Sequence, residues 1–466
     1  MVIARKVLLS GVSGILLFTS FAPIDFWPGA FLGTALLYGL IKDEVLLRRS
    51  VLSFISGALF FLPLLHWSST YVGALPWLIL ALGEAVIFSL VGLLPFKGNF
   101  GSAIQFAATF TLVEIVRMKA PFGGFGWGRL GFTQVDSLAH LYPYISIAGI
   151  SFLITFISVL FVTSFKHFLF ATLLIVLLIS IPMKIQTDGQ FSVIAVQGGV
   201  DRLGLDFNDR ALSVLSRHAE ETMKISNPSQ LVIWPENASD LDPIRNTEAN
   251  AIIKTVIEKI DRPLLIGAVE SSSQGPQNSS ILFGSDGEIK SRYVKQDLAP
   301  FGEYIPLRPL SEAISREAIG VRDFIPGRSW VRHTVDKTTF SSAICFEILD
   351  DDHIRSGAQG SEFLVAQTNN ATFGKSWQAA QQLQITRSRA AELGKSFAVV
   401  STTGFTAQIS PEGSIVKELK QFEPGYLNME IEKVKGESAA SKVGSQAWIF
   451  FAAGLIALSR TRIFSR

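Results

Sequence analysis

The sequence predicts an α-helical membrane domain joined to a layered α/β domain, and three observations support this fold class. Hydrophobic residues make up 48% of the 466 residues and include 36 phenylalanines, which is too apolar for one ordinary soluble enzyme. Long apolar stretches recur up to Met183, and one more lies near the end of the chain. Between them, residues 185–445 are polar and mixed, with short β-rich segments that alternate with helical patterns.

Residues 1–184 contain seven apolar stretches, most of them close to the ~20 residues that a helix needs to cross ~30 Å of hydrocarbon. Residues 446–466 contain a shorter apolar stretch, Ala447–Leu458, which is predicted to be an eighth span followed by a cytoplasmic tail. The seven predicted spans are Val7–Ile24, Phe26–Ile41, Val51–Val72, Leu75–Phe96, Phe100–Val116, Leu141–Phe165 and Phe168–Met183.

The first apolar stretch could instead be a cleaved signal peptide, because Arg5 and Lys6 precede it. Pro23 after Phe21-Ala22 makes a poor cleavage site, and further spans follow at once. A retained first helix is therefore favoured.

The distribution of positive charge predicts the orientation of the spans, because short cytoplasmic loops are enriched in Lys and Arg. The side that carries most loop cations along an alternating eight-span path is assigned to the cytoplasm. The opposite side receives Lys119, Arg129 and, after the seventh span, the whole polar region, which is therefore predicted to lie outside the cytoplasmic membrane. The cytoplasmic cations are Arg5, Lys6, Lys42, Arg48, Arg49, Lys97, Lys166, Arg460, Arg462 and Arg466.

Charge and cysteine content exclude several classes of protein. The formal net charge is only +2, so no broad basic field indicates a nucleic-acid partner. Cys345 is the single cysteine, which excludes an intrachain disulfide framework and any multi-cysteine metal site.

The sequence pattern of the polar region, residues 185–445, predicts an α/β domain. Helical spacing of apolar residues runs from Leu212 to Met223 and from Ile252 to Ile260. Two hairpins are predicted around the turns Ser285-Asp286-Gly287 and Pro411-Glu412-Gly413. The predicted buried strands are Ser192–Gln197, Leu231–Trp234, Leu264–Val269, Ser342–Ile344, Phe363–Gln367 and Ala398–Ser401.

Three polar residues stand where predicted strands end, which is where α/β sheets usually place their functional sites. Glu236 follows LVIWP, Lys295 ends the second strand of the first hairpin, and Cys345 follows SSAI. A thiolate can act as a nucleophile, a carboxylate can take its proton, and an ammonium can stabilise both the thiolate and an oxyanion. Each residue also has an ordinary structural interpretation, since a cysteine after an apolar run is often an inert core residue and loop charges are usually solvated. Spacing alone does not decide between them.

The motifs around these three residues carry a family resemblance. WPENA at 234–238, KQDLAPFGEYIP at 295–306 and CFE at 345–347 occur in that order. This set resembles the nitrilase, or carbon–nitrogen hydrolase, superfamily, which implies a four-layer α-β-β-α sandwich on the extracytoplasmic side. With apolar spans before and after the domain, nearly the whole chain resembles the apolipoprotein N-acyltransferase family of bacterial membranes. Further family-like stretches are TNNATFG and QITRSRAAELGK within 368–395, and GGFGWGRLGFTQ at 123–134.

The resemblance implies a role for each matching residue. Cys345 would be the nucleophile, Glu236 the general base and Lys295 the oxyanion partner. Phe346 stands where the family often has tyrosine, and Phe207 where it has a tryptophan, so an aromatic ring is kept but a polar group is lost. The residues expected to support the site are Asn278, Glu303, Phe346 and Glu347, and those expected to bind substrate are Phe207, Trp234 and Tyr304.

The activity implied by the resemblance uses two lipid-anchored substrates. A phospholipid, expected to be phosphatidylethanolamine, would donate an acyl chain to Cys345 as a thioester, and the N-terminal amine of a diacylglyceryl-cysteine lipoprotein would accept it. No metal or other cofactor and no nucleic acid is expected. The expected protein is a monomeric, multi-pass enzyme of the bacterial inner membrane with its catalytic domain in the periplasm.

Two alternatives use the same residues differently. A membrane-tethered amidase of the nitrilase type would share the Glu–Lys–Cys set but let water resolve the thioester. A transporter would instead use Glu84 and Glu114, which lie within apolar spans, although Glu114 is expected to pair with Arg117 one turn away. A serine hydrolase is disfavoured because no G-x-S-x-G motif occurs in the sequence.

Overall fold

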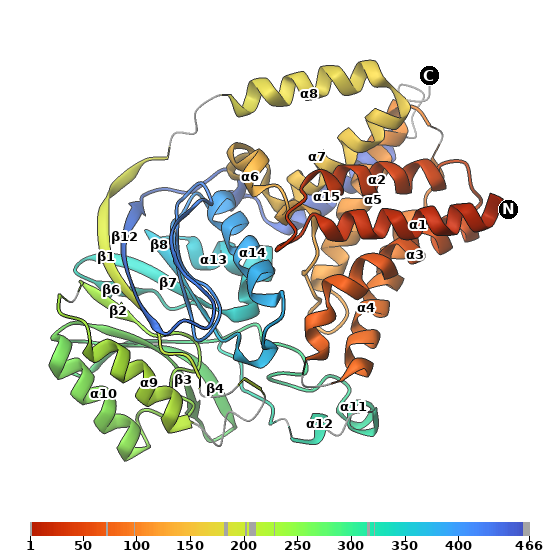
Figure 1. The fold of residues 1–466 in the computed structure, drawn as a ribbon. Coiled ribbons are helices and arrows are strands. Elements are labelled where there is room, and N and C mark those ends of the chain that lie inside the picture. Colours follow the sequence, from red (N-terminus) through yellow and green to blue (C-terminus); the bar gives the residue numbers. More distant parts are fainter. Residues whose placement is uncertain are drawn as a thin grey trace. The chain divides into compact units, whose positions relative to one another are not determined.

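The computed structural model describes residues 2–70, 73–96, 98–180, 185–200, 203–204, 211–227, 229–314, 317–320 and 322–459. The chain divides into two compact units (Figure 1). The helical unit comprises Met1–Lys184 and Ser438–Arg466, and the α/β unit comprises Ile185–Glu437.

The helical unit is built from long apolar helices. Three helical segments, Leu46–Leu64, Ala74–Gly92 and Val135–Thr163, are long and apolar enough to cross a membrane, and α2, α8 and α15 are shorter apolar helices. These helices support membrane association, and the eight-span count and its orientation stay predictions. The main helices are α1 (Val2–Thr19), α2 (Pro28–Ile41), α3 (Leu46–Leu64), α4 (Ala74–Phe88), α5 (Phe100–Lys119), α7 (Tyr142–Thr163), α8 (Phe165–Ile179) and α15 (Ser445–Ser459).

Small residues let the helices of this unit approach closely. A side-chain carbon on Gly14 in α1 would lie only 2.1 Å from the carbonyl oxygen of Ser56 in α3, so this crossing requires glycine. Next to it, the hydroxyl of Ser13 donates a hydrogen bond of 2.7 Å to the carbonyl of Gly33 in α2. Backbone contact and a buried hydroxyl therefore join the first three helices where side-chain packing alone would hold them further apart.

The two carboxylates that were predicted to lie within apolar spans are paired, but not as the sequence suggested. Arg117 donates to Glu84 at 2.8 Å rather than to Glu114. Glu114 instead accepts the backbone N–H of Leu130 at 2.7 Å and lies 3.9 Å from the guanidinium of Arg129. The expected Glu114–Arg117 pair is therefore wrong, because the loop after α5 folds back and brings Arg129 to Glu114. Each carboxylate has a cation beside it, which is the arrangement of a structural ion pair.

Two of the cations used to predict orientation are buried rather than free loop charges. Arg129 is fully buried in the helical unit. Arg49 donates to the backbone carbonyls of Gly92 at 2.9 Å and Glu44 at 2.6 Å. Arg49 thus satisfies carbonyls at a helix end, and the orientation rests on the remaining cations.

The α/β unit contains two six-stranded sheets with the orders β12-β1-β2-β3-β4-β5 and β11-β10-β9-β8-β7-β6. The pairs β1–β2, β2–β3, β7–β8 and β8–β9 are parallel, and the outer strands of each sheet pair antiparallel. The strands are β1 (Thr187–Gln197), β2 (Leu231–Ile233), β3 (Leu264–Ser271), β4 (Pro276–Phe283), β5 (Ile289–Val294), β6 (His333–Val335), β7 (Thr338–Ile344), β8 (Phe363–Thr368), β9 (Phe397–Ser401), β10 (Thr406–Ile409), β11 (Ile415–Leu419) and β12 (Gly425–Val434).

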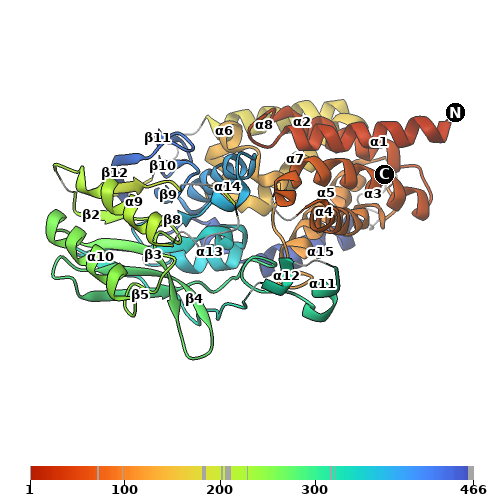
Figure 2. The same ribbon diagram turned by 60° about the horizontal axis from the view of Figure 1, so that its bottom comes forward.

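Alternating side chains of the strands build two cores. Along β1, Val193 and Ala195 pack between the sheets, whereas Ile194 and Val196 pack under helices α9 (Ala211–Met223) and α10 (Thr247–Ile260). Helices α13 (Asp351–Ala358) and α14 (Gln378–Leu393) lie on the side of the sheets away from α9 and α10 (Figures 1 and 2). This order of layers is the predicted α-β-β-α sandwich, and it confirms the fold class.

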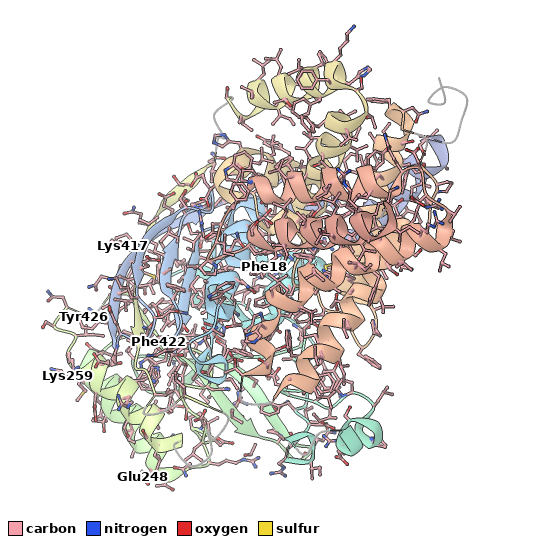
Figure 3. The ribbon with its side chains drawn as sticks, turned by 45° about the vertical axis from the view of Figure 1, so that its right-hand side comes forward. Phe18, Glu248, Lys259, Lys417, Phe422 and Tyr426 are labelled. Atoms are coloured by element: carbon pink, nitrogen blue, oxygen red, sulfur yellow. The ribbon has the colours of Figure 1, made fainter. Side chains whose placement is uncertain are left out.

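Helix α10 shows how local sequence defines an element. The side chain of Asn246 caps its first turn by accepting from the N–H of Ala249 at 2.9 Å. Glu248 lies in the first turn and Lys259 in the last, at the two ends of the helix (Figure 3), where both charges oppose the helix dipole. The helix ends at Asp261, which adopts a left-handed conformation.

All six predicted strands and both hairpins are present, with ends moved by a few residues. Strands β6 and β12 were not predicted. β6 has only three residues, and β12 alternates polar and apolar side chains at the edge of its sheet, so neither shows the continuous apolar run of a central strand.

Candidate active site

The ends of strands from both sheets bring the predicted residues together. Glu236 lies just beyond β2 and Lys295 directly follows β5, both in the first sheet. Cys345 directly follows β7 of the second sheet and begins a 3-10 helix, η6 (Cys345–Leu349). Its φ of 53° is a backbone conformation that residues with side chains rarely adopt, and such local strain is common at functional sites.

A buried hydrogen-bonded cluster surrounds Glu236. The amide of Asn278 donates 2.8 Å bonds to one oxygen of Glu236 and one of Glu303, and the backbone N–H of Asn369 donates to the other oxygen of Glu236 at 2.8 Å. The ammonium of Lys295 lies 2.8 Å from Glu303 and 3.5 Å from Glu236. Both carboxylates and the lysine are thus held in defined positions away from water, which makes their charges act strongly on one another.

The electrostatics of this cluster oppose ionisation of the thiol and favour the charged lysine. Burial raises the pKa of Cys345 well above its usual range, and so do the charge of Glu236 and a hydrogen bond to it, while Lys295 opposes this rise. Burial also raises the pKa of Glu236, and Lys295 again opposes the rise. Burial lowers the pKa of Lys295, but the charges of Glu303 and Glu236 outweigh it, so that the net pKa is raised. The site therefore holds a charged lysine beside a protonated thiol and a carboxylate with raised basicity.

Glu347 links the nucleophile turn to the segment after Lys295. One of its oxygens accepts the N–H of Ile344 at 2.7 Å, and the other accepts the N–H of Gln296 at 2.8 Å and the hydroxyl of Tyr293 at 2.7 Å. His353 lies 3.2 Å from the same carboxylate. Burial raises the pKa of Glu347, but His353 and the N–H donors outweigh it and the net pKa is lowered. A buried, ionised Glu347 therefore connects the backbones on either side of the site.

The other predicted residues lie in different surroundings. Phe346 is partly buried and packs against the small apolar cluster that contains Cys345. Tyr304 is partly buried beside Glu303 in the sequence, and Phe207 falls outside the described residues. Trp234 is fully buried in the core under α9, and its indole N–H donates to Thr222 at 2.9 Å. Its ring packs in this core, and a role in substrate binding stays a prediction.

Sequence reasoning missed three residues that take part in this arrangement: Asn369, His353 and Gln382. The side-chain N–H of Gln382 lies 3.9 Å from the sulfur of Cys345. Asn369 and Gln382 fall within the stretch 368–395 that resembles the family, but only that resemblance pointed to them. A buried glutamine in a helix has no spacing that distinguishes it from its neighbours.

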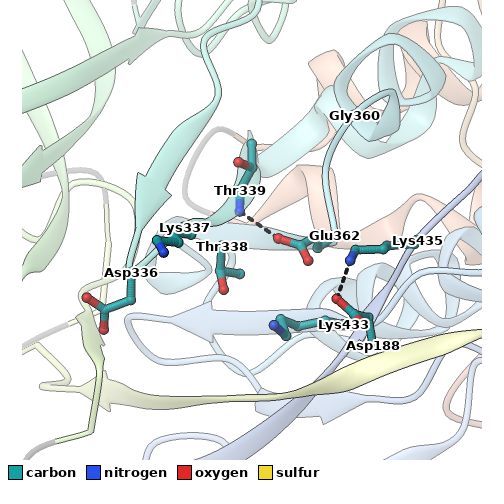
Figure 4. A pocket seen from close by; sticks show the side chains of 9 residues that line it. All are labelled: Asp188, Asp336, Lys337, Thr338, Thr339, Gly360, Glu362, Lys433 and Lys435. Atoms are coloured by element: carbon teal, nitrogen blue, oxygen red, sulfur yellow. Dashed lines mark hydrogen bonds and ion pairs between the residues drawn. The ribbon is translucent and has the colours of Figure 1, made fainter.

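A hollow of about 470 Å³ in the α/β unit is lined by strand ends and the β6–β7 turn (Figure 4). Lys435 forms an ion pair with Asp188 at 2.6 Å, and Glu362 accepts the backbone N–H of Thr339 at 2.9 Å. It contains none of the predicted catalytic residues. The lining residues are Asp188, Asp336, Lys337, Thr338, Thr339, Gly360, Glu362, Lys433 and Lys435.

The part of the chain that the structure describes contains no group of three or more His, Cys, Asp or Glu side chains placed to hold a metal ion. The buried cluster brings together a thiol, two carboxylates and an ammonium, which are groups that can act as a nucleophile, a base and a fixed cation.

Comparison with known proteins finds relatives of both parts of the chain. Residues 13–160 match the model of the apolipoprotein N-acyltransferase N-terminal domain, and residues 208–440 match that of carbon-nitrogen hydrolase. An apolipoprotein N-acyltransferase of Mycolicibacterium smegmatis is 32% identical over 92% of this chain and 80% of that protein, and one of Haemophilus ducreyi is 28% identical over 94% and 93%. Among solved structures, an amidase from Nesterenkonia sp. is 16% identical with a TM-score of 0.38, covering 54% of this chain and 95% of its own.

The two sheets, their covering helices and the sequence match define the α/β unit as a carbon–nitrogen hydrolase domain. The chain as a whole belongs to the apolipoprotein N-acyltransferase family. The amidase and transporter alternatives are accordingly not favoured, and the chain is an acyltransferase.

Proposed function

We propose that this chain transfers an acyl group from a membrane phospholipid, through a thioester on Cys345, to the N-terminal amine of diacylated lipoproteins. The observation that carries the proposal is the buried contact set of Cys345, Glu236 and Lys295 in a chain of this family. The same acyl chain leaves one substrate and is attached to another. A covalent intermediate on the enzyme lets the two substrates use a single site in turn.

In the first step, Glu236 accepts the thiol proton of Cys345 as the sulfur attacks the ester carbonyl of the phospholipid. The raised pKa of Glu236 suits this role, because a base whose pKa lies closer to that of the thiol accepts the proton more readily. The charge that develops on the carbonyl oxygen is stabilised by the ammonium of Lys295. The ester C–O bond then breaks, Glu236 returns its proton to the departing lysophospholipid oxygen, and a thioester remains.

In the second step, the free amine of the lipoprotein attacks the thioester carbon. Glu236 takes a proton from the attacking amine, and Lys295 again stabilises the oxyanion. The C–S bond breaks as the amide forms, and the sulfur regains a proton from Glu236. The enzyme returns to its starting protonation state, so no cofactor is needed for balance.

Glu303 and Asn278 position the base and the cation rather than react. Glu303 keeps Lys295 at 2.8 Å, and Asn278 bonds to both carboxylates through one amide. The lysine therefore retains its charge when Glu236 becomes protonated during each step. One chain supplies every group of this set, in agreement with a monomeric enzyme.

The helical segments before and after the α/β unit would anchor it at a bilayer, the layer that also holds both substrates. We place the protein in the bacterial inner membrane as a multi-pass protein with the α/β unit facing the periplasm. Phosphatidylethanolamine is the proposed donor. The support is the family membership, the apolar helices and the remaining loop cations.

A single-turnover assay tests this function. Purified full-length protein is mixed with phosphatidylethanolamine that carries a labelled acyl chain, and then with a synthetic diacylated lipopeptide. We expect a labelled, hydroxylamine-sensitive protein that loses its label as the lipopeptide gains it. Release of labelled free fatty acid without labelled lipopeptide would show a hydrolase and overturn the proposal.

A further inference from the structure

Helix α14 places unusual polarity in the interior of the α/β unit. Gln378, Gln381, Gln382 and Gln384 are all buried. A buried amide needs hydrogen-bond partners, because leaving one unpaired costs free energy. The partners of Gln382 decide which end of its amide faces Cys345.

A chain of hydrogen bonds leads from the backbone N–H of Gly404 to Cys345, and a backbone N–H can only donate. The N–H of Gly404 donates to the hydroxyl of Ser401 at 2.8 Å, and that hydroxyl donates its own hydrogen to the oxygen of Asn370, 2.7 Å away. The hydroxyl of Thr368 donates to the same oxygen at 3.1 Å. The oxygen of Asn370 is therefore an acceptor, and its NH₂ group must point the other way.

The NH₂ group of Asn370 sets the orientation of Gln382. It donates to the side-chain oxygen of Gln382 at 2.7 Å, and the NH₂ of Gln378 donates to that oxygen at 3.1 Å. With both acceptor positions of the oxygen used, the NH₂ group of Gln382 is the end that faces the sulfur of Cys345 at 3.9 Å. A chain of fixed polarity thus runs from Gly404 to the thiol.

Close packing keeps this chain in place. A side-chain carbon on Gly404 would lie 2.2 Å from the oxygen of Asn370 and 2.7 Å from the hydroxyl of Ser401. Only glycine leaves room for the first two bonds. Ser401 and Thr368 end the adjacent strands β9 and β8, so the sheet itself holds the beginning of the chain.

We propose that Gln382 is a further catalytic residue, whose side-chain N–H donates to the sulfur of Cys345 and stabilises the thiolate during attack and departure. Asn370 is the positioning residue that directs this donor. The inference rests on the proposed role of Cys345 as the nucleophile. A neutral thiol is a weak acceptor, which is consistent with the long contact, whereas a thiolate accepts a stronger, charge-assisted bond. The donor therefore favours the charged sulfur over the neutral one.

This donor acts where the surroundings otherwise oppose the charge. Burial and Glu236 raise the pKa of Cys345, and Lys295 is a cation shared with two carboxylates. The NH₂ group of Gln382 adds the positive end of a dipole, and the described partners of this amide are Asn370, Gln378 and Cys345 rather than a carboxylate. Loss of a hydrogen bond to a charged group should lower the thiolate population about 10- to 100-fold near neutral pH.

The test uses the fact that Cys345 is the only cysteine, so alkylation by iodoacetamide reports on this sulfur alone. The full-length protein and the variants Gln382→Leu and Asn370→Asp are alkylated over a range of pH. Asn370→Asp replaces the donor that faces Gln382 with an acceptor, which should turn the amide of Gln382 and place its oxygen toward the sulfur. Gln384→Leu, another buried glutamine of α14, is the matched control.

We expect both Gln382→Leu and Asn370→Asp to move the alkylation midpoint to higher pH and to slow alkylation about 10- to 100-fold near neutral pH. Gln384→Leu should leave the alkylation midpoint unchanged. Thermal stability is measured for every variant, so that a loss of packing is separated from a shift of the midpoint. An unchanged profile in Gln382→Leu would overturn the proposal and leave Gln382 a packing residue. If Gln382→Leu does not fold, Gln382→Met decides in the same way, because methionine keeps the length of the side chain and has no N–H to donate. Asn370→Asp alone does not decide, since its added carboxylate also opposes ionisation of the thiol.

The acyl-transfer assay separates this inference from the proposed function. Cys345→Ala should form no acyl-enzyme. Turnover by Cys345→Ala would refute the nucleophile itself, whereas a normal acyl-enzyme with an unshifted alkylation profile in Gln382→Leu would refute only the role of the amide.

Discussion

The ammonium of Lys295 lies closer to Glu303, at 2.8 Å, than to Glu236, at 3.5 Å. The nearer carboxylate therefore serves as the permanent counterion of the lysine. Glu236 is left with weaker ionic contact and a raised pKa, which leaves it able to exchange protons. This division of labour between two buried glutamates underlies several of the predictions.

Glu303→Gln should slow acylation by removing that counterion. The lysine should then move toward Glu236 and stabilise its ionised form, which makes it a poorer base. A displacement of about 1 Å at a reacting group can cost on the order of 10²-fold in rate. Single-turnover acylation by labelled phospholipid measures the effect, and a rate equal to that of the unmodified protein would show that Glu303 does not position Lys295.

Replacement of Cys345 by serine or alanine should leave a folded protein that forms no acyl-enzyme. A serine hydroxyl is far harder to ionise than a thiol, whose ordinary pKa is ~8.5, and Glu236 has too little basicity to compensate. Labelling with phospholipid followed by gel analysis checks this expectation, with circular dichroism as the control for folding. Substantial acyl transfer by Cys345→Ala would return the cysteine to a structural role.

Glu236→Gln and Lys295→Ala should respond differently to pH. Glu236→Gln lacks a proton acceptor, so hydroxide can partly replace it, and acylation should recover as pH rises above ~8.5. Because burial raises the pKa of Cys345, the recovery should extend to higher pH than for an exposed thiol. Lys295→Ala should lose about 10²–10³-fold in both half-reactions and gain less, because added hydroxide supplies no cation.

The Gln substitution needs a control, because Glu236 accepts from Asn278 on one oxygen and from the N–H of Asn369 on the other. In Glu236→Gln the new NH₂ group would face one of these two donors, unless the side-chain amide of Asn278 turns and presents its oxygen instead. Thermal stability of Glu236→Gln should therefore be measured beside its activity. Equal pH recovery of Glu236→Gln and Lys295→Ala would show that base and oxyanion partner are assigned wrongly.

His353 should make thermal stability depend on pH. Burial lowers its pKa, but Glu347, Asp297 and Asp350 outweigh this, so the pKa in the folded protein is raised above the unfolded value of ~6.5. A group with a raised folded pKa stabilises fully below its unfolded pKa and loses that contribution as pH rises through the folded value. His353→Gln should therefore reduce the melting temperature more at pH 6 than at pH 9. An equal loss at both values would mean that the imidazole is neutral and only packs against Trp330.

The proposed membrane orientation is tested with reporters that are active only outside the cytoplasm. A fusion after Gln186 should be active, whereas a fusion after Lys42 should not, because the first is placed in the periplasm and the second among cytoplasmic cations. The reverse pattern would place the α/β unit in the cytoplasm and separate it from lipoprotein substrates.

The sequence by itself determined the class of fold and the three central residues of the candidate site. Buried strands appear as continuous apolar runs because both faces are covered, and each run stops where a polar residue leaves the sheet. Glu236, Lys295 and Cys345 lie at or just after these strand ends, and the sequence motifs around them resemble those of one family. Short and edge strands such as β6 and β12 lack such runs and were visible only in the structure.

Tertiary structure alone decided which groups pair and which end of an amide faces the sulfur. Glu114 was expected to pair with Arg117 because helical spacing allows it, but Arg129 reaches it from a returning loop. The preference of Lys295 for Glu303 over Glu236 is a difference between 2.8 and 3.5 Å, and the orientation of Gln382 follows from the hydrogen bonds that Asn370 and Gln378 donate to its oxygen. Sequence spacing encodes periodicity along one element, whereas these relationships depend on distances between elements that only the packed chain brings to hydrogen-bonding range.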